Sequence, residues 1–299
     1  MIKPTPFISN SINLPIKHKI LIACIVFCIT MPIPAMLSAQ TGNTQKKETK
    51  NAEFYRKQGE EKSLRGDFRG ALEDFNTAIS LNPKDTAAYY NRGIARAITN
   101  NLQGAADDYT KVIELNPKDP GAYINRAEIR LSLKKEKEAE ADLNKAISLS
   151  EDYSMAYFLR ANIKNNRNDF KAAVTDYSKA INLDPDHAGA YFNRAIAKSF
   201  MNDFKGAIDD YTQVIALAPD DAVAYFNRGF MKSKINDLPG ALNDFNKAIK
   251  LDPKYPEAYF NRGFANFLTG NKDAACKDWQ AASRFGDEDA AAALQTHCK

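Results

Sequence analysis

The chain has 299 residues, of which 44% are apolar, with 14 glycines and 13 prolines, so its composition excludes a disordered protein. The formal charge of +4 is concentrated near the start, because residues 1–39 contain three lysines and no acidic residue. The remainder is close to neutral with mixed charges, which argues against nucleic acid as a partner.

Residues 1–39 have the pattern of a secretory signal peptide. A basic segment at 17–19 precedes an unbroken apolar run at 20–29, and prolines and Ala39 follow. We expect cleavage after Ala39 and export, to the periplasm of a Gram-negative bacterium. The alternative is an uncleaved inner-membrane anchor, which would be the chain's membrane contact, although the apolar run is short for a span. Residues 40–51 lack apolar side chains and are predicted to form a flexible linker.

From residue 52 onward the sequence repeats with a period of 34 residues. A fixed period of this length indicates a solenoid, in which each repeat buries its apolar face against its neighbours. Within a repeat, two helical patterns such as 87–98 and 102–115 are separated by a residue suited to the left-handed conformation of a helix end. The recurring tyrosines are Tyr55, Tyr89, Tyr123, Tyr157, Tyr191, Tyr225 and Tyr259.

The second repeat shows the residue pattern most clearly. It has a large aromatic at Tyr89, a small residue at Gly93, Ala105, a second aromatic at Tyr109 and a helix-ending Pro117. This pattern resembles the tetratricopeptide repeat (TPR). The resemblance implies an all-α, right-handed α-solenoid of helix-turn-helix repeats. The predicted repeats are 52–85, 86–119, 120–153, 154–187, 188–221, 222–255 and 256–286, with a capping helix at 287–299.

The third and fourth repeats depart from the pattern. A charged run occupies 134–142, Leu143 replaces an aromatic residue, and Glu151 replaces the usual proline. We interpret these changes as drift, and the alternative is a deliberate bend in the solenoid.

Two cysteines remain after the leader. Cys276 lies at the start of the last helix B, and Cys298 ends the capping helix, which should run antiparallel to it. In an exported protein this predicts a disulfide, and the alternative is two buried thiols. With His297 they supply three ligands in an unusual spacing, so we expect no metal site.

The resemblance places one face of each helix A in a concave groove. At repeat position 6 an asparagine row is interrupted by Lys57 and Leu159, and it is similar to the asparagine ladder of the O-linked N-acetylglucosamine transferase, which holds a peptide backbone. Asparagine both donates and accepts, so it pairs with any peptide amide. Aromatic rings at position 5 would add apolar pockets, or alternatively pack as core. The rows are Asn91, Asn125, Asn193, Asn227 and Asn261, and Tyr90, Phe158, Phe192, Phe226 and Phe260, with Ile124 in place of a ring in the third repeat.

Arginine at position 7 and aspartate at position 23 form two further rows. We predict a structural ion-pair ladder rather than a ligand site, and the sequence leaves open whether each pair forms within a repeat or between neighbours. The residues are Arg92, Arg126, Arg160, Arg194, Arg228 and Arg262, and Asp74, Asp108, Asp142, Asp176, Asp210, Asp244 and Asp278.

The sequence contains no glycine-rich phosphate loop, nucleophile elbow or other catalytic constellation. It therefore predicts a non-enzymatic scaffold without cofactor, which binds an extended peptide or partner protein in its groove, in the bacterial cell envelope. One alternative is a structural subunit of an envelope or secretion complex that uses its convex face or its ends. Another is an accessory partner of a cell-wall enzyme.

Overall fold

The computed structural model describes residues 50–298, so the predicted signal peptide and most of the predicted linker lie outside the described residues. The chain there is built of helices joined by short turns, and none of these helices is long and apolar enough to span a membrane. Its contacts group it into two compact segments that divide between residues 111 and 112.

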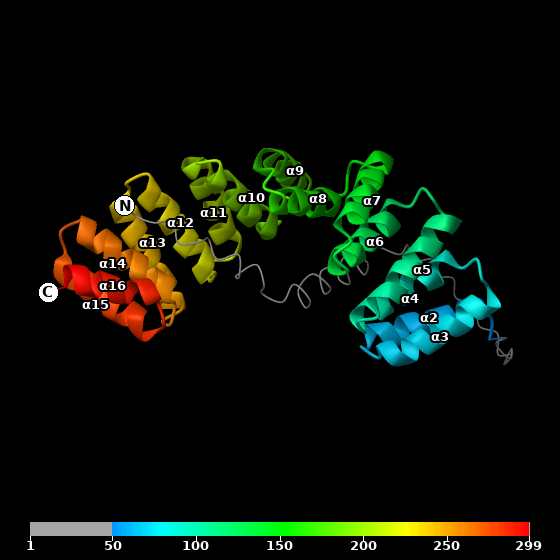
Figure 1. Cartoon of the computed structure of the whole chain (residues 1–299). Coiled ribbons are helices and arrows are strands. Elements are labelled where there is room, and N and C mark those ends of the chain that lie inside the picture. Colours follow the sequence, from blue (N-terminus) through cyan, green and yellow to red (C-terminus); the bar gives the residue numbers. More distant parts are fainter. Residues whose placement is uncertain (1–49, 299) are drawn as a thin grey trace, which may run out of the picture. The chain divides into compact units, whose positions relative to one another are not determined.

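Each repeat consists of a helix A of 13 residues followed by a helix B of 13 or 14 residues (Figure 1). The predicted all-α tandem helix-turn-helix solenoid is thereby confirmed. The A helices are α2 (Ala52–Leu64), α4 (Thr86–Ile98), α6 (Pro120–Ser132), α8 (Ser154–Asn166), α10 (Ala188–Phe200), α12 (Ala222–Lys234) and α14 (Pro256–Leu268). The B helices are α3 (Phe68–Leu81), α5 (Leu102–Leu115), α7 (Glu136–Leu149), α9 (Phe170–Leu183), α11 (Phe204–Leu217), α13 (Leu238–Leu251) and α15 (Lys272–Arg284), and α16 (Glu288–His297) follows.

The turn between helix A and helix B has the same conformation in every repeat. Its central residue has a φ between 60° and 84°, in the left-handed region that glycine and asparagine adopt most readily. Lys134 adopts it as well, with a φ of 61°, so the turn persists where the sequence pattern fails. An aspartate or asparagine then caps most B helices, as Asp203 does by accepting from the Gly206 N–H.

Each helix pair closes around one large side chain from helix B. Tyr177, Tyr211, Phe245 and Trp279 are fully buried at repeat position 24, opposite a small residue of helix A. The fit is tight, since a Cβ added at Gly263 would lie 2.6 Å from Trp279 Nε1. Small residues on helix A are therefore required for the two helices to approach.

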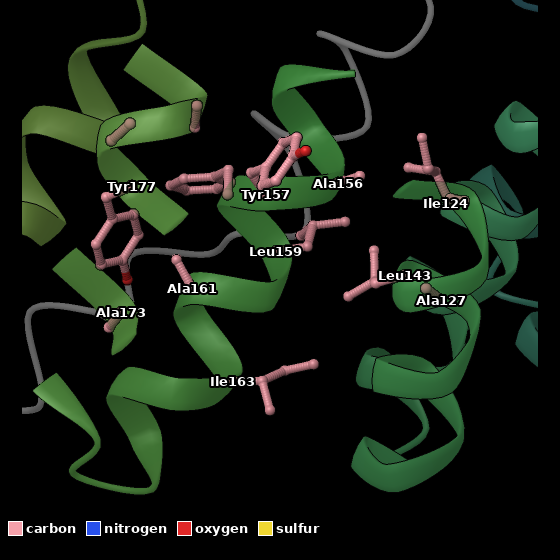
Figure 2. Packing of buried hydrophobic residues seen from close by; sticks show 14 of the residues in the cluster. Ile124, Ala127, Leu143, Ala156, Tyr157, Leu159, Ala161, Ile163, Ala173 and Tyr177 are labelled. Carbon is pink, nitrogen blue, oxygen red and sulfur yellow. The ribbon is translucent and has the colours of Figure 1, made fainter. Parts of the chain in front are cut away.

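At the junction of the irregular third and fourth repeats, aliphatic side chains add to the core. Figure 2 shows Leu143 of α7 and Leu159 and Ile163 of α8 projecting into the space between their helix pairs, and all three are buried. The charged run is also paired, because Arg167 at the end of α8 contacts Glu136 and Glu140 at 2.6 Å each. The departures from the repeat pattern are thus compensated locally.

The capping helix α16 packs on α15 (Figure 1) and buries Ala290 and Ala293 against it. The His297 ring lies 4.6 Å from the Phe267 ring and 5.7 Å from the Trp279 ring. The structure contains a disulfide between Cys276 and Cys298, which ties the end of α16 to the first turn of α15.

His187 is the N-cap of α10, and we expect it to make the stability of this helix depend on pH. Its Nδ1 accepts a hydrogen bond from the Ala190 N–H at 3.3 Å, and its ring lies 4.5 Å from the Phe158 ring. Burial lowers the pKa of His187 below its usual value, and the nearby Asp184 offsets this only in part. Protonation would replace the accepting lone pair with a proton and so remove the helix cap.

Because the folded pKa of His187 is depressed, its contribution to stability is complete above about pH 6.5 and is lost as the pH falls through the folded value. We expect His187→Asn, which keeps a capping side chain, to reduce the drop in thermal midpoint between pH 7 and pH 5. Asn51 and Asn271 cap α2 and α15 in this way. An unchanged pH dependence in the variant would contradict this role.

Candidate binding face of the A helices

The A helices form the more closely spaced layer of the stacked pairs. In the segment after residue 111, α6 touches α8, α8 touches α10 and α12 touches α14, whereas successive B helices there make no contact of that extent. Side chains at repeat positions 5, 6 and 9 therefore lie close to their equivalents in the next repeat. Positions 5 and 6 are where the sequence predicts ligand contacts.

Two asparagines of the position-6 row link successive A helices. Asn91 Nδ2 donates to Glu60 Oε1 at 3.0 Å, and Asn193 Nδ2 donates to Asn162 Oδ1 at 2.9 Å. In both cases the acceptor lies 31 residues earlier, at position 9 of the preceding helix A. These asparagines are engaged within the protein, and Asn125 is half-buried on α6.

The last two asparagines of the row differ because the residue at position 9 of the preceding helix A has no side-chain oxygen. Ile196 precedes Asn227 and Phe230 precedes Asn261 at the same 31-residue spacing. Asn261 Nδ2 donates instead to the Glu257 carbonyl of its own helix at 2.8 Å. The half-buried Asn227 side chain makes no hydrogen bond with any residue between 50 and 298.

The side chains at position 5 differ in their exposure. Ile124 and Phe158 are buried, and the Phe158 ring packs 6.1 Å from the Tyr177 ring. Tyr90 on α4, and Phe192, Phe226 and Phe260 on α10, α12 and α14, remain partly exposed. We define the A-helix face as the half-buried side chains at positions 5, 6 and 9 of these last three helices: Phe192, Asn193, Ile196, Phe226, Asn227, Phe230, Phe260, Asn261 and Phe264.

The arginine and aspartate rows pair within each repeat. Arg194 donates from Nε and Nη2 to the two Asp210 oxygens at 2.9 and 2.6 Å, and Lys198 contacts the same carboxylate at 2.8 Å. Five further repeats have the same arginine–aspartate fork. In the first repeat, Gln58 replaces the arginine and Lys62 contacts Asp74 at 2.7 Å.

In five repeats the arginine also contacts the preceding repeat. Its Nη1 donates to a polar side chain 16 residues earlier on the previous helix B, as Arg194 does to Ser178 Oγ at 2.9 Å. The guanidinium carbon lies 5.5 Å from the Tyr191 ring centroid. With its donors engaged on both sides, the row is structural. The other arginine–acceptor pairs are Arg92–Asn76, Arg160–Asn144, Arg228–Thr212 and Arg262–Asn246.

Sequence reasoning missed two sets of residues that decide the site. One is the set of polar acceptors at position 25, which the conspicuous recurrence of asparagine, serine and threonine there could have indicated. The other is position 9, where Glu60 and Asn162 accept a hydrogen bond and Ile196 and Phe230 do not. Between residues 50 and 298 no cluster of three or more histidine, cysteine or acidic side chains is arranged to hold a metal ion.

Comparisons with known proteins give the same architecture. Tetratricopeptide repeat models match residues 57–120, 120–153 and 188–221, and a TPR repeat model matches 161–198 and 231–270. Together these matches cover more than half of the chain. No protein of curated function matches it.

Three solved structures illustrate the likeness. YrrB, described as a TPR protein with an unusual peptide-binding site, is 22% identical over 62% of this chain and 96% of its own, with a TM-score of 0.56. The C-terminal part of a TPR repeat-containing protein from Cytophaga hutchinsonii is 15% identical over 81% of this chain and 98% of its own, with a TM-score of 0.65. PilF of Pseudomonas aeruginosa is 15% identical over 69% and 94%, with a TM-score of 0.61. At these identities the likeness shows the fold.

Proposed function

Because the chain belongs to the tetratricopeptide repeat family, whose fold implies protein or peptide partners, we propose that it is a non-enzymatic scaffold that binds an extended segment of a partner protein on its A-helix face. The observation that carries this proposal is Asn227, a half-buried amide that makes no hydrogen bond within residues 50–298. Its donor and acceptor match one peptide unit of any sequence.

The surroundings of Asn227 favour a chain with apolar side chains. Partly exposed rings stand on the helix before it, on its own helix and on the helix after it, at Phe192, Phe226 and Phe260. A ring beside an amide offers an apolar surface to a ligand side chain while the amide holds the backbone. The peptide-binding site named for YrrB supports a peptide as the ligand class for this fold.

We also propose that the protein acts in the bacterial cell envelope after removal of residues 1–39. The basic and apolar pattern of that segment supports export, and the Cys276–Cys298 disulfide suits an oxidising compartment. The protein isolated from its own cells is then expected to begin at Gln40, which N-terminal sequencing measures. An intact Met1 would instead favour the anchored form.

A second candidate function is a structural subunit that docks through the edge formed by the turns between helices A and B. Phe200, Met201, Ile235 and Leu268 lie there and are 40–56% exposed, outside the A-helix face. Exposed apolar side chains concentrated at such an edge are typical of contact surfaces.

Affinity capture from the native cell envelope tests both functions. We expect Asn227→Ala/Phe226→Ala to lose the partner that the wild-type protein captures, while Phe200→Ser/Ile235→Ser retains it. Asn243→Ala is the matched control, since this exposed asparagine lies on α13, away from the A helices. Circular dichroism must first show that the variants fold. Loss of the partner from the edge variant alone would establish the second function and exclude the first.

A further inference from the structure

One acceptor oxygen serves two donors at the junction of α8, α9 and α10. The Tyr177 hydroxyl donates to Asn162 Oδ1 at 2.6 Å, and Asn193 Nδ2 donates to the same oxygen at 2.9 Å. Tyr177 is fully buried, and Figure 2 shows it extending from α9 beside α8. The side-chain carbonyl of Asn162 thus satisfies a buried hydroxyl and an amide at once.

One repeat later the donors are present and the acceptor is missing. Tyr211 and Asn227 occupy the positions of Tyr177 and Asn193, 34 residues on, and Ile196 replaces Asn162. Tyr211 is fully buried, and its hydroxyl has no hydrogen-bond partner within the described residues. The half-buried Asn227 amide makes no hydrogen bond there either. Buried polar side-chain atoms are rarely left unpaired, so the Tyr211 hydroxyl needs an explanation.

We propose that Tyr211 and Asn227 form a ligand subsite, in which a backbone carbonyl of the bound peptide plays the part that Asn162 Oδ1 plays one repeat earlier. The carbonyl accepts from the Tyr211 hydroxyl and from Asn227 Nδ2. This inference rests on the function proposed above, and it adds a second protein donor and a fixed position for one peptide unit along the A-helix face.

Burial of the Tyr211 hydroxyl favours an uncharged acceptor over a carboxylate. The Asp210 carboxylate next to Tyr211 is already paired with Arg194 and Lys198, so its charge is matched within the protein. A peptide carbonyl accepts the hydrogen bonds without bringing an unpaired charge to a buried position.

The neighbouring rings favour apolar residues on either side of that peptide unit. The Phe192 ring packs edge-on against the Tyr211 ring at 5.4 Å, and the Phe226 ring lies 5.0 Å from the Tyr255 ring. Phe192 and Phe226 are both partly exposed. The ligand class is therefore an extended, uncharged peptide segment with apolar side chains.

Two substitutions test the subsite, one by removing a donor and the other by supplying an acceptor from the protein. Tyr211→Phe removes the hydroxyl, and phenylalanine suits the fold because Phe75 and Phe245 occupy the same repeat position. Ile196→Asn installs the acceptor found at Asn162, so that the protein satisfies both donors itself and competes with the ligand. Tyr177→Phe is the matched control, since its hydroxyl is already paired inside the protein.

The test uses a 12-residue peptide selected from a displayed random library on the wild-type protein, with binding measured by calorimetry. We expect Tyr211→Phe and Ile196→Asn each to weaken binding about tenfold, the effect of one lost hydrogen bond, without lowering the thermal midpoint. Tyr177→Phe is expected to lower the midpoint and to leave the dissociation constant unchanged within about twofold.

The outcomes separate the subsite from the function on which it rests. If the peptide binds the wild type and both variants equally, the subsite is excluded and the function stands. If Tyr211→Phe lowers the midpoint with unchanged affinity, the hydroxyl is held by a resident water, and the subsite is again excluded. If selection yields no peptide that binds the wild type, the function and the subsite both fail.

Discussion

Replacing Asp210 with alanine is expected to lower the free energy of unfolding by about 3–5 kcal/mol. The Asp210 side chain is 2% exposed and accepts from Arg194 and Lys198, which are themselves mostly buried. Its removal leaves two cations beside each other without their counter-charge. Such a loss is much larger than that of a surface ion pair, because water cannot replace the missing partner.

Urea unfolding followed by circular dichroism measures this loss, and Asp209→Ala is its matched control. Asp209 precedes Asp210 on α11 but is exposed. Its substitution should change stability by less than about 0.5 kcal/mol. Equal effects of the two substitutions would show that the ladder does not stabilise the fold. Arg228→Ala tests the other partner of a pair, and an unchanged melting temperature would lead to the same conclusion.

Removing the disulfide with Cys276→Ser/Cys298→Ser is expected to destabilise the C-terminal end by about 3 kcal/mol, because the bond closes a loop with a sequence separation of 22 residues. The ten-residue α16 is too short to remain helical by itself, so it should detach before the remaining repeats unfold. Repeat proteins permit such partial unfolding, since each repeat contacts only its neighbours.

Trp279 reports this detachment directly. It is the single tryptophan of the chain, it is fully buried, and it packs against residues of α14 and α16. In the double variant its fluorescence should change at a lower urea concentration than the circular dichroism signal, and the wild type in reductant should behave alike. Coincident transitions at the wild-type midpoint would mean that the disulfide contributes nothing to holding the cap.

The fold could be predicted because its determinants recur. Every repeat needs a small residue on helix A opposite a large one on helix B, as Gly263 faces Trp279. These residue types therefore recur every 34 residues and can be recognised in a single sequence. The sequence leaves open whether each arginine pairs within its repeat or with a neighbouring repeat, and the reason is physical. The guanidinium has donors on two edges, and it uses one within the repeat and the other between repeats, as Arg194 does with Asp210 and Ser178.

The site was harder to predict because periodicity shows what repeats share, and the site depends on where they differ. Asn193 and Asn227 are identical in the repeat pattern. Their chemistry diverges because the residue 31 positions earlier is Asn162 in one case and Ile196 in the other. Phe158 likewise matches Phe192 in sequence, yet it is buried, with His187 packed against it.

The spacing of the arginine contacts bears on how such a chain can evolve. In five repeats the arginine donates to a residue 16 positions before it and to an aspartate 16 positions after it, as Arg262 does with Asn246 and Asp278. An in-frame duplication or deletion of one complete repeat therefore restores both partners at the new joint, wherever the break occurs. The gene can change the length of the protein in whole steps without first acquiring compensating mutations.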